Sequence, residues 1–346
     1  MELTASSRVA ILLQGGIKGH HGKTGLAFLR YSQTDIVAII DSEAVGESLF
    51  ESTKIDRPVP IVADVKAALA YKPNVLLIGI APSGGQLPTE LLAEIKIAVK
   101  AGLSIINGLH TPLQPQFPHL QPQQSIWDIR QEPKGLTIGN GKARSLKARR
   151  ILTVGTDMGI GKMSTSLELY RAALDRGIKA QFIATGQAGI AIAGQGIALD
   201  AVRVDFAAGA VEKTVLEFGI DRDLILIEGQ GSLLHPGSTA TLPLIRGSQP
   251  TGLVLVHRAG AKYIRDLPDF LIPPLPEVIQ LCETVANAAS LVGAKVKVKA
   301  IALNTLGMND TEAQATIQAT SELTGLLCSD VVRFGGATIL PAICGK

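Results

Sequence analysis

Cysteine, aromatic residues and long hydrophobic runs are all scarce in this sequence of 346 residues. The three cysteines, Cys282, Cys328 and Cys344, have no paired spacing, which argues against a disulfide framework and against a zinc site. No apolar stretch reaches the roughly 18–20 residues that a membrane-spanning helix needs. The first residues also lack the charged region and cleavage site of a secretory signal. Together these absences favour a soluble protein of the cytoplasm without a membrane partner.

A strong charge of either sign is also missing, because the formal net charge is only +3. Five basic residues do cluster shortly before the middle of the chain, namely Lys142, Arg144, Lys147, Arg149 and Arg150. Such a run is typical of a solvated linker, and it also stands where it would meet an acidic ligand of the segment that follows. Nucleic-acid binding needs a wider basic face and usually stacking aromatic residues, which make up only 4% of this chain. We therefore expect a small-molecule ligand and no nucleic-acid partner.

Aliphatic residues, by contrast, are abundant, and hydrophobic residues make up 46% of the chain. This balance suits parallel sheets that are covered by helices on both faces. In the first half, aliphatic runs expected to be strands (9–14, 36–40, 75–80 and 103–106) alternate with expected helices (24–31 and 88–101). The alternation predicts right-handed crossovers and a parallel sheet, whose ligands lie at the carboxyl ends of the strands.

The chain is too long for one ordinary core, and two domains are the natural expectation. Thr111–Gln124 contains four prolines and five glutamines, so it is expected to be an irregular connector. We predict a Rossmann-like domain over residues 1–145 and an α/β domain of the P-loop NTPase type over residues 146–346. The apolar segment Ala337–Ile343 would either complete the core of the second domain or pack on a partner, which leaves a homo-oligomer open.

The second half opens with an expected strand (150–154), a glycine-rich loop ending in Lys162, and an expected helix (163–176). Backbone N–H groups of such a loop approach phosphate oxygens closely, and the lysine supplies a positive charge. Two features depart from the usual P-loop. Five residues rather than four separate Gly155 from Gly161, and Met163 replaces the hydroxyl residue that would ligate magnesium. The residues expected to bind the cofactor are Gly155, Thr156, Asp157, Gly159, Gly161, Lys162 and Ser164, and no metal ligand is assigned.

A similar spacing occurs near the start of the chain, where Gly16 is followed by Gly22, Lys23 and Thr24. Two interpretations stay open, a second anion site or a glycine turn with a solvated lysine. Asp41 ends the second expected strand, where a dinucleotide-binding domain has its ribose acid. Because the first loop lacks a GxGxxG pattern, we do not expect nicotinamide binding.

Polar residues at other strand ends are candidates for the chemistry. Glu228 follows the expected strand 224–227, and His235 lies seven residues on, where it would act as general base or cap its loop. Arg258 follows the strand 253–256 and suits a substrate carboxylate. Gln187 and His110 also follow strands and are further candidates for substrate binding.

The loop sequence GTDMGIGK resembles that of dethiobiotin synthetase and its relatives. Residues 224–232 resemble the acidic second phosphate motif of that group, and residues 301–304 resemble its strand that ends in a base-contacting asparagine. This resemblance implies that Glu228 lies beside the phosphates and that Asn304 contacts the nucleobase of a bound nucleotide.

A wider resemblance covers nearly the whole chain. The motifs GIAPSGG, NGLH, GTDMGIGKM and IEGQGSLLHP are similar to those of the DgcN family, long known only as a domain of unknown function. The family combines a Rossmann-like and a P-loop domain, and at least one branch is understood as D-glutamate N-acetyltransferase, with acetyl-CoA as donor. The resemblance thus implies acetyl transfer to an amino acid. An ATP- and magnesium-dependent ligase or kinase-like enzyme is the alternative, and a nucleotide-sensing regulator is a third.

Overall fold

The computed structural model describes residues 3–19, 21–81, 87–288 and 295–345. The chain forms two compact units, which are considered separately. The first comprises Met1–Glu132 together with Gln187–Ala201, and the second comprises Pro133–Gly186 and Val202–Lys346. Each contains a six-stranded parallel sheet between helices, which confirms the predicted α/β class.

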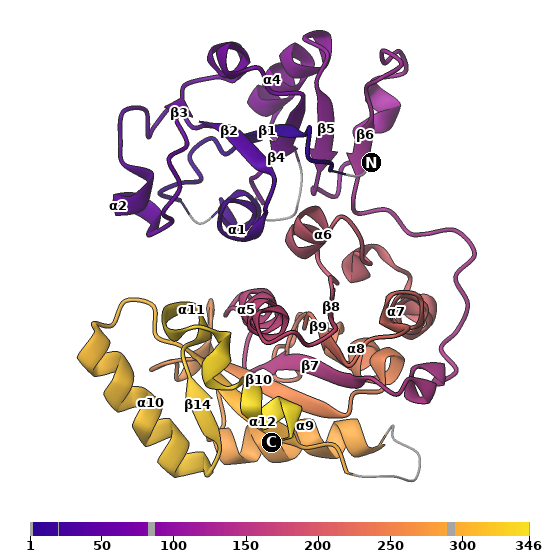
Figure 1. The fold of residues 1–346 in the computed structure, drawn as a ribbon, viewed down its shortest axis with the longest axis vertical. Coiled ribbons are helices and arrows are strands. Elements are labelled where there is room, and N and C mark those ends of the chain that lie inside the picture. Colours follow the sequence, from indigo (N-terminus) through magenta and orange to yellow (C-terminus); the bar gives the residue numbers. More distant parts are fainter. Residues whose placement is uncertain (1–2, 20, 82–86, 289–294, 346) are drawn as a thin grey trace. The chain divides into compact units, whose positions relative to one another are not determined.

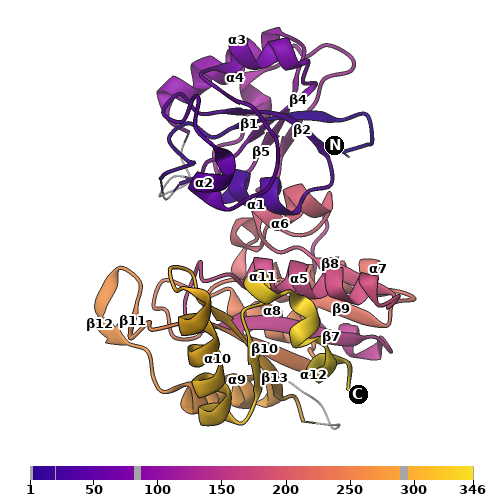
Figure 2. The ribbon, with the colours of Figure 1, turned by 60° about the vertical axis from the view of Figure 1, so that its left-hand side comes forward.

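The sheet of the first unit has the strand order β3-β2-β1-β4-β5-β6, which is the order of Rossmann folds. Right-handed crossovers require α1 on one face and α3 and α4 on the other, as Figures 1 and 2 show. Because both faces are covered, the central strand β4 is wholly aliphatic and buried, and β1 is likewise after its exposed first residue, Arg8. The strands are β1 (Arg8–Leu12), β2 (Asp35–Ile40), β3 (Ile61–Val62), β4 (Val75–Ile78), β5 (Ser104–Asn107) and β6 (Ile126–Asp128), and the helices are α1 (Lys23–Tyr31), α2 (Leu49–Thr53), α3 (Val65–Ala68) and α4 (Thr89–Lys100).

The first unit is completed by a segment from later in the chain. Helix α6 (Gln187–Ala193) packs against α1. Beyond it, Asp200 Oδ2 lies 3.1 Å from Arg130 Nη2, and the Arg130 side chain is only 11% exposed. Burial lowers the pKa of Arg130, and the Asp200 carboxylate opposes this shift. The ion pair therefore fastens the returning segment to the first unit.

The sheet of the second unit has the order β14-β13-β10-β7-β9-β8. The crossovers place α5 with α11 and α12 on one face and α7 to α10 on the other. A separate antiparallel hairpin joins β11 and β12. The strands are β7 (Arg149–Gly155), β8 (Ala180–Ile183), β9 (Leu224–Ile227), β10 (Gly252–Arg258), β11 (Tyr263–Ile264), β12 (Leu267–Leu271), β13 (Val298–Asn304) and β14 (Leu327–Ser329), and the helices are α5 (Lys162–Asp175), α7 (Val204–Gly219), α8 (Thr241–Ser248), α9 (Leu275–Ala288), α10 (Asp310–Thr324), α11 (Val331–Phe334) and α12 (Leu340–Cys344).

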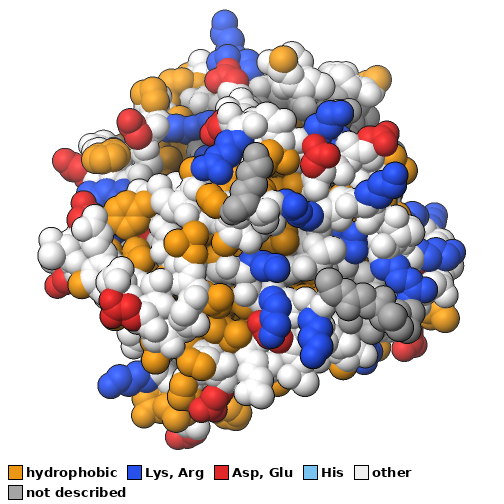
Figure 3. All heavy atoms as spheres, turned by 60° about the horizontal axis from the view of Figure 1, so that its bottom comes forward, with side chains coloured by type: hydrophobic (Ala, Val, Ile, Leu, Met, Phe, Trp, Pro, Cys, Tyr) orange, Lys and Arg blue, Asp and Glu red, His pale blue; other side chains and the backbone are white. Residues whose placement is uncertain are grey.

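Two segments for which the sequence allows more than one interpretation, the C-terminal apolar segment and the basic run, have structural roles. The C-terminal apolar residues Ile339, Leu340 and Ile343 are buried in the core of the second unit, so this segment completes its own domain. In the basic run, the buried Arg150 donates to the carbonyl oxygens of Leu146, Ala148 and Gln249. Figure 3 shows one face of the molecule, on which basic side chains are interspersed with acidic and hydrophobic ones. Within the described residues, no helix is long and apolar enough to cross a membrane.

Candidate functional site

The loop between β7 and α5 presents an uninterrupted row of backbone donors. Positive φ angles at Gly159 (64°) and Gly161 (116°) turn the chain into the helix. Among the described residues, no hydrogen bond engages the N–H groups of residues 159–164, whereas the next amide, that of Thr165, is bonded to the carbonyl oxygen of Gly161. Six unpartnered N–H groups at a helix start, where the dipole is positive, form an anion-binding arrangement.

Lys162 lies buried inside this loop. Its Nζ donates to the carbonyl oxygen of Asp157 at 2.6 Å, and a Cβ added at Gly155 would be only 3.2 Å from Nζ. Burial lowers the pKa of Lys162 to about 8, although Asp157 and Glu228 act in the opposite direction. The loop thus holds a poorly hydrated ammonium group, and glycine at 155 leaves the space for it.

The side chains of Thr156 and Asp157 hold the loop in place. Thr156 Oγ1 lies 2.9 Å from Nδ1 of His257, at the end of β10, and burial lowers the pKa of that histidine. Asp157 accepts from the N–H of Met158 at 2.6 Å through Oδ1 and from the N–H of Arg265 at 2.7 Å through Oδ2. These contacts tie the loop to β10 and to the β11–β12 hairpin.

Glu228 follows β9, the neighbour of β7, and is buried. Its Oε2 accepts from the N–H groups of Thr185 (2.8 Å) and Gly186 (3.2 Å), and its Oε1 accepts from Nε2 of Gln230 (3.0 Å). A Cβ added at Gly186 would be 2.4 Å from Gln230 Nε2, so a side chain there would displace the Gln230 amide that donates to Glu228. The structure therefore fixes one carboxylate near the Lys162 charge. Within the described part of the chain, no cluster of three or more His, Cys, Asp or Glu side chains has the arrangement of a metal site.

His235 lies in a half-exposed turn beyond Glu228. Its Nδ1 accepts from the N–H of Gly237 at 3.0 Å, so the neutral ring carries its hydrogen on Nε2. This geometry suits a hydrogen-bond donor better than a base. The catalytic role of His235 stays a prediction.

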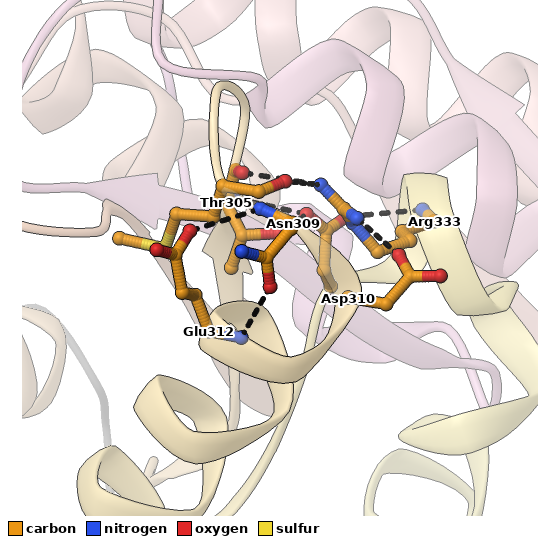
Figure 4. A network of polar contacts seen from close by, with 7 residues as sticks. Thr305, Asn309, Asp310, Glu312 and Arg333 are labelled. Carbon is orange, nitrogen blue, oxygen red and sulfur yellow. Dashed lines mark hydrogen bonds and ion pairs between the residues drawn. The ribbon is translucent and has the colours of Figure 1, made fainter.

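Asn304, at the end of β13, is tied to the loop by its side chain. Its Nδ2 donates to the carbonyl oxygen of Ile160 at 2.9 Å, and its Oδ1 accepts from the N–H of Leu306 at 3.0 Å. Figure 4 shows the polar network that follows, in which Arg333 bridges Asp310 and the backbone after Asn304. Asp330 also accepts from the N–H and the hydroxyl of Thr305. Asn304 thus supports the loop, and contact with a nucleobase stays a prediction.

The other predicted substrate residues belong to different units. His110 and Gln187 lie in the first unit, where His110 Nε2 is 3.9 Å from Asp200 Oδ2 and the Gln187 side chain lies against Gly108. Arg258 belongs to the second unit, at the exposed end of β10.

A cavity of about 270 Å³ lies beside the phosphate loop and is confined to the second unit. Its wall includes Arg258, whose substrate role stays a prediction, and also Tyr263 and Arg265 of the hairpin, which the sequence did not single out. The short strands that contain them are too short to show a periodic pattern in the sequence. Asp200 was not singled out either, because its partner Arg130 is far away in the sequence.

The early glycine–lysine loop has a different arrangement. The buried Asp41 accepts from the N–H groups of Gly15 and Ile17, both at 3.0 Å. A Cβ added at Gly22 would be 2.1 Å from the carbonyl oxygen of Gly16, so the loop closes on itself. His20 of this loop lies outside the described residues, as do residues 82–85 of the GIAPSGG motif.

Comparison with known proteins supports the motif-based resemblance. The chain is 36% identical over 277 residues to a protein of Pseudoalteromonas sp. named D-glutamate N-acetyltransferase, covering 78% of this chain and 81% of that one. It is 34% identical over 285 residues to a protein of the same name from Tritonibacter scottomollicae, covering 81% and 84%. A crystal structure of a DUF1611 family protein from Anabaena variabilis ATCC 29413 matches with a TM-score of 0.95 and 58% identity, over 99% of this chain and 100% of that one.

Two family descriptions match successive parts of the chain. The Rossmann-like N-terminal domain of DUF1611, a domain of unknown function, matches residues 42–132. The P-loop domain of the same family matches residues 137–340. The second match alone spans more than half of the sequence, and the chain therefore belongs to the DUF1611 family.

Proposed function

We propose that this protein is an N-acetyltransferase that moves the acetyl group of acetyl-CoA to the amino group of an amino acid, with D-glutamate as the first acceptor to test. The name of the two curated relatives, which are about 35% identical over most of the chain, supports the reaction type. Family membership alone does not fix the substrate, so the donor and the acceptor need their own support from the site.

The proposal that acetyl-CoA is the acetyl donor rests on the loop between β7 and α5. The six N–H groups of residues 159–164, which have no partner among the described residues, and the buried Lys162 favour a diphosphate. Met163 offers no hydroxyl for a magnesium ion at the position where P-loop NTPases use one. A loop that grips phosphate without metal-dependent hydrolysis suits the diphosphate of coenzyme A, because that group is bound and not cleaved.

Acetyl transfer forms an N–C bond and breaks the C–S bond of the thioester. The attacking amine loses one proton to a base, and coenzyme A leaves as a thiolate. Glu228 is the proposed base, since its carboxylate is fixed next to the loop by backbone and side-chain donors. The Nε2–H of His235, or a loop N–H, is the proposed donor to the oxyanion. Arg258 is proposed to hold the acceptor carboxylate, with Gln187 and His110 as further candidates.

The alternative is an ATP-dependent ligase or kinase-like enzyme. Glu228, which follows β9, and Asn304, the last residue of β13, support this alternative, because the resemblance to dethiobiotin synthetase implies an acid and an asparagine at the ends of two such strands. Ser164 and Thr165 would then have to supply the magnesium hydroxyl that Met163 lacks.

A ligand panel with product analysis tests the proposal. Acetyl-CoA, coenzyme A and ATP with magnesium are compared by thermal shift, because a ligand that binds only the folded state raises apparent stability. We expect shifts with acetyl-CoA and coenzyme A, and N-acetyl-D-glutamate with free thiol when acetyl-CoA and D-glutamate are supplied together. A shift with ATP and magnesium alone, together with ADP release, would replace the acetyltransferase with the ligase.

A further inference from the structure

Two arginines, Arg258 and Arg265, line the cavity beside the phosphate loop, and neither belongs to the loop. Thr156, Asp157 and Gly159 line it on the loop side, and Arg258, Tyr263 and Arg265 line it on the other. Neither Lys162 nor Glu228 is among the lining residues. The cavity is thus lined by residues of the loop and of the hairpin rather than by Lys162 and Glu228.

Both arginines are available to a ligand. Among the described residues, no hydrogen bond or ion pair engages the guanidinium of Arg258, which is exposed at the end of β10. The guanidinium of Arg265 has one ion pair, with its sequence neighbour Asp266 at 3.4 Å, and the Asp266 side chain is 87% exposed. Exposed pairs of this kind contribute little to stability. An oxyanion entering the cavity would thus compete only with water and one weak ion pair.

The backbone that presents Arg265 is fixed before any ligand arrives. Its N–H donates to Asp157 Oδ2 at 2.7 Å, which joins the hairpin to the loop. The adjacent Ile264 is buried, and the N–H of Ile272 donates to the carbonyl oxygen of Lys262 at 2.9 Å across the base of the hairpin. Preorganisation of this kind lowers the entropic cost of binding.

We infer that Arg258 and Arg265 form a second anion subsite, which binds an oxyanion of the ligand in addition to the phosphates held by the loop. Guanidinium groups bind carboxylate and phosphate oxygens in bidentate pairs. This inference rests on the proposed function for the identity of the two possible sources. One source is the phosphomonoester at the 3′ position of coenzyme A, and the other is a carboxylate of the acceptor.

Three matched variants test the subsite. Arg258→Gln and Arg265→Gln remove the two charges, and Lys262→Gln is the control, because Lys262 is an exposed cation of the same segment that does not line the cavity. If the phosphomonoester is the anion, both arginine variants weaken acetyl-CoA binding about tenfold in calorimetry. The same variants then bind 3′-dephospho-acetyl-CoA with the Kd of the wild type. If an acceptor carboxylate is the anion, the KM for D-glutamate rises about tenfold while the Kd for acetyl-CoA stays at the wild-type value. An Arg265→Gln protein that behaves like Lys262→Gln with every probe overturns the subsite.

A second measurement does not depend on acetyl transfer. The Nε–H signals of Arg258 and Arg265 in NMR spectra of the whole protein, assigned with the two variants, are followed during titration with inorganic phosphate and with D-glutamate. We expect both signals to move together with at least one probe. If they move but no N-acetyl product forms with acetyl-CoA, the proposed function fails and the subsite stands. Signals that stay still with both probes overturn the subsite even in an active acetyltransferase.

Discussion

The two glycine–lysine loops of this protein have the same spacing, but their first turns are held by different acceptors. In the first unit, the carboxylate of Asp41 already accepts the N–H groups of Gly15 and Ile17, and Gly22 packs directly on Gly16. In the second unit, the N–H of Thr156, at the position equivalent to Ile17, donates to the carbonyl oxygen of Val256, and the N–H groups of residues 159–164 have no partner in the described structure. The two loops therefore share their spacing, but only the first has a carboxylate bound to its first turn.

The largest effect expected from this difference concerns the two lysines. Lys162→Met should weaken acetyl-CoA binding by about 10–100-fold, because a charge-assisted contact contributes about 1.5–3 kcal/mol. Lys23→Met is the matched control in the first loop and should change the Kd less than twofold. Isothermal titration calorimetry measures both. Equal losses in the two variants would contradict the distinction between the loops.

Removal of the internal acceptor should affect the first unit alone. Asp41→Ala leaves the N–H groups of Gly15 and Ile17 without their carboxylate, which should lower the free energy of unfolding by about 2 kcal/mol. Urea denaturation measures this loss, and the Kd for acetyl-CoA should stay at the wild-type value. A variant of unchanged stability, or one with weakened donor binding, would show that Asp41 does not have this role.

Alanine substitutions at two glycines with positive φ distinguish the effect of backbone strain on stability from an effect on ligand binding. Gly161 has a φ of 116° and Gly177, beyond the end of α5, has a φ of 71° with open space around it. An alanine at either position should cost about 1 kcal/mol of stability, since left-handed backbone is unfavourable for residues with a Cβ. Only Gly161→Ala should also weaken acetyl-CoA binding, by about tenfold. Full binding by this variant would mean that the loop geometry is not needed.

The pKa of Lys162 predicts a pH dependence with a definite sign. The folded-state pKa of about 8 is below the ordinary lysine pKa of 10.5, so raising the pH from 7 to 9 discharges the lysine and should weaken acetyl-CoA binding by up to about tenfold. Between pH 8 and 10.5 the unfolded chain binds more protons, so this group makes the fold more stable as the pH rises. Isothermal titration calorimetry between pH 7 and 9 should show that acetyl-CoA affinity falls with pH in the wild type and not in Lys162→Met. A slope that persists in the variant would assign it to another group.

The smallest effect is expected at the position that departs from the usual P-loop. Met163→Thr restores a hydroxyl, yet it should change acetyl-CoA affinity less than twofold and should not create ATP hydrolysis, because the ligand is held without metal. A coupled assay for ADP measures this directly. Magnesium-dependent ATP turnover in the wild type or in the variant would favour the ligase alternative.

Much of the fold was predictable because it depends on local pattern. The four aliphatic residues Leu224–Ile227 form β9 at the predicted bounds, and the predicted strand 150–154 and helix 163–176 correspond to β7 and α5 within a residue or two at their ends. The glycine-rich loop between β7 and α5 could be located for the same reason, because its glycines and its lysine are adjacent in sequence.

What could not be predicted depends on contacts between distant residues. Helix α6 (Gln187–Ala193) follows the second-unit strand β8 in the chain but packs against α1, and its sequence has no mark of this return. Strand β6 (Ile126–Asp128) has only three residues, too few for a period. The joining of Arg265 to Asp157 links residues 108 positions apart, and the use of Asp41 as an internal acceptor appears only when β1 and β2 lie side by side.

Hydrogen–deuterium exchange with and without acetyl-CoA tests most directly whether the second loop holds the phosphates. We expect the amides of residues 159–164 to become protected when acetyl-CoA binds, while those of Gly15 and Ile17 keep the exchange rates that Asp41 sets. Protection of the first loop with no change at residues 159–164 would contradict the assignment of the donor site.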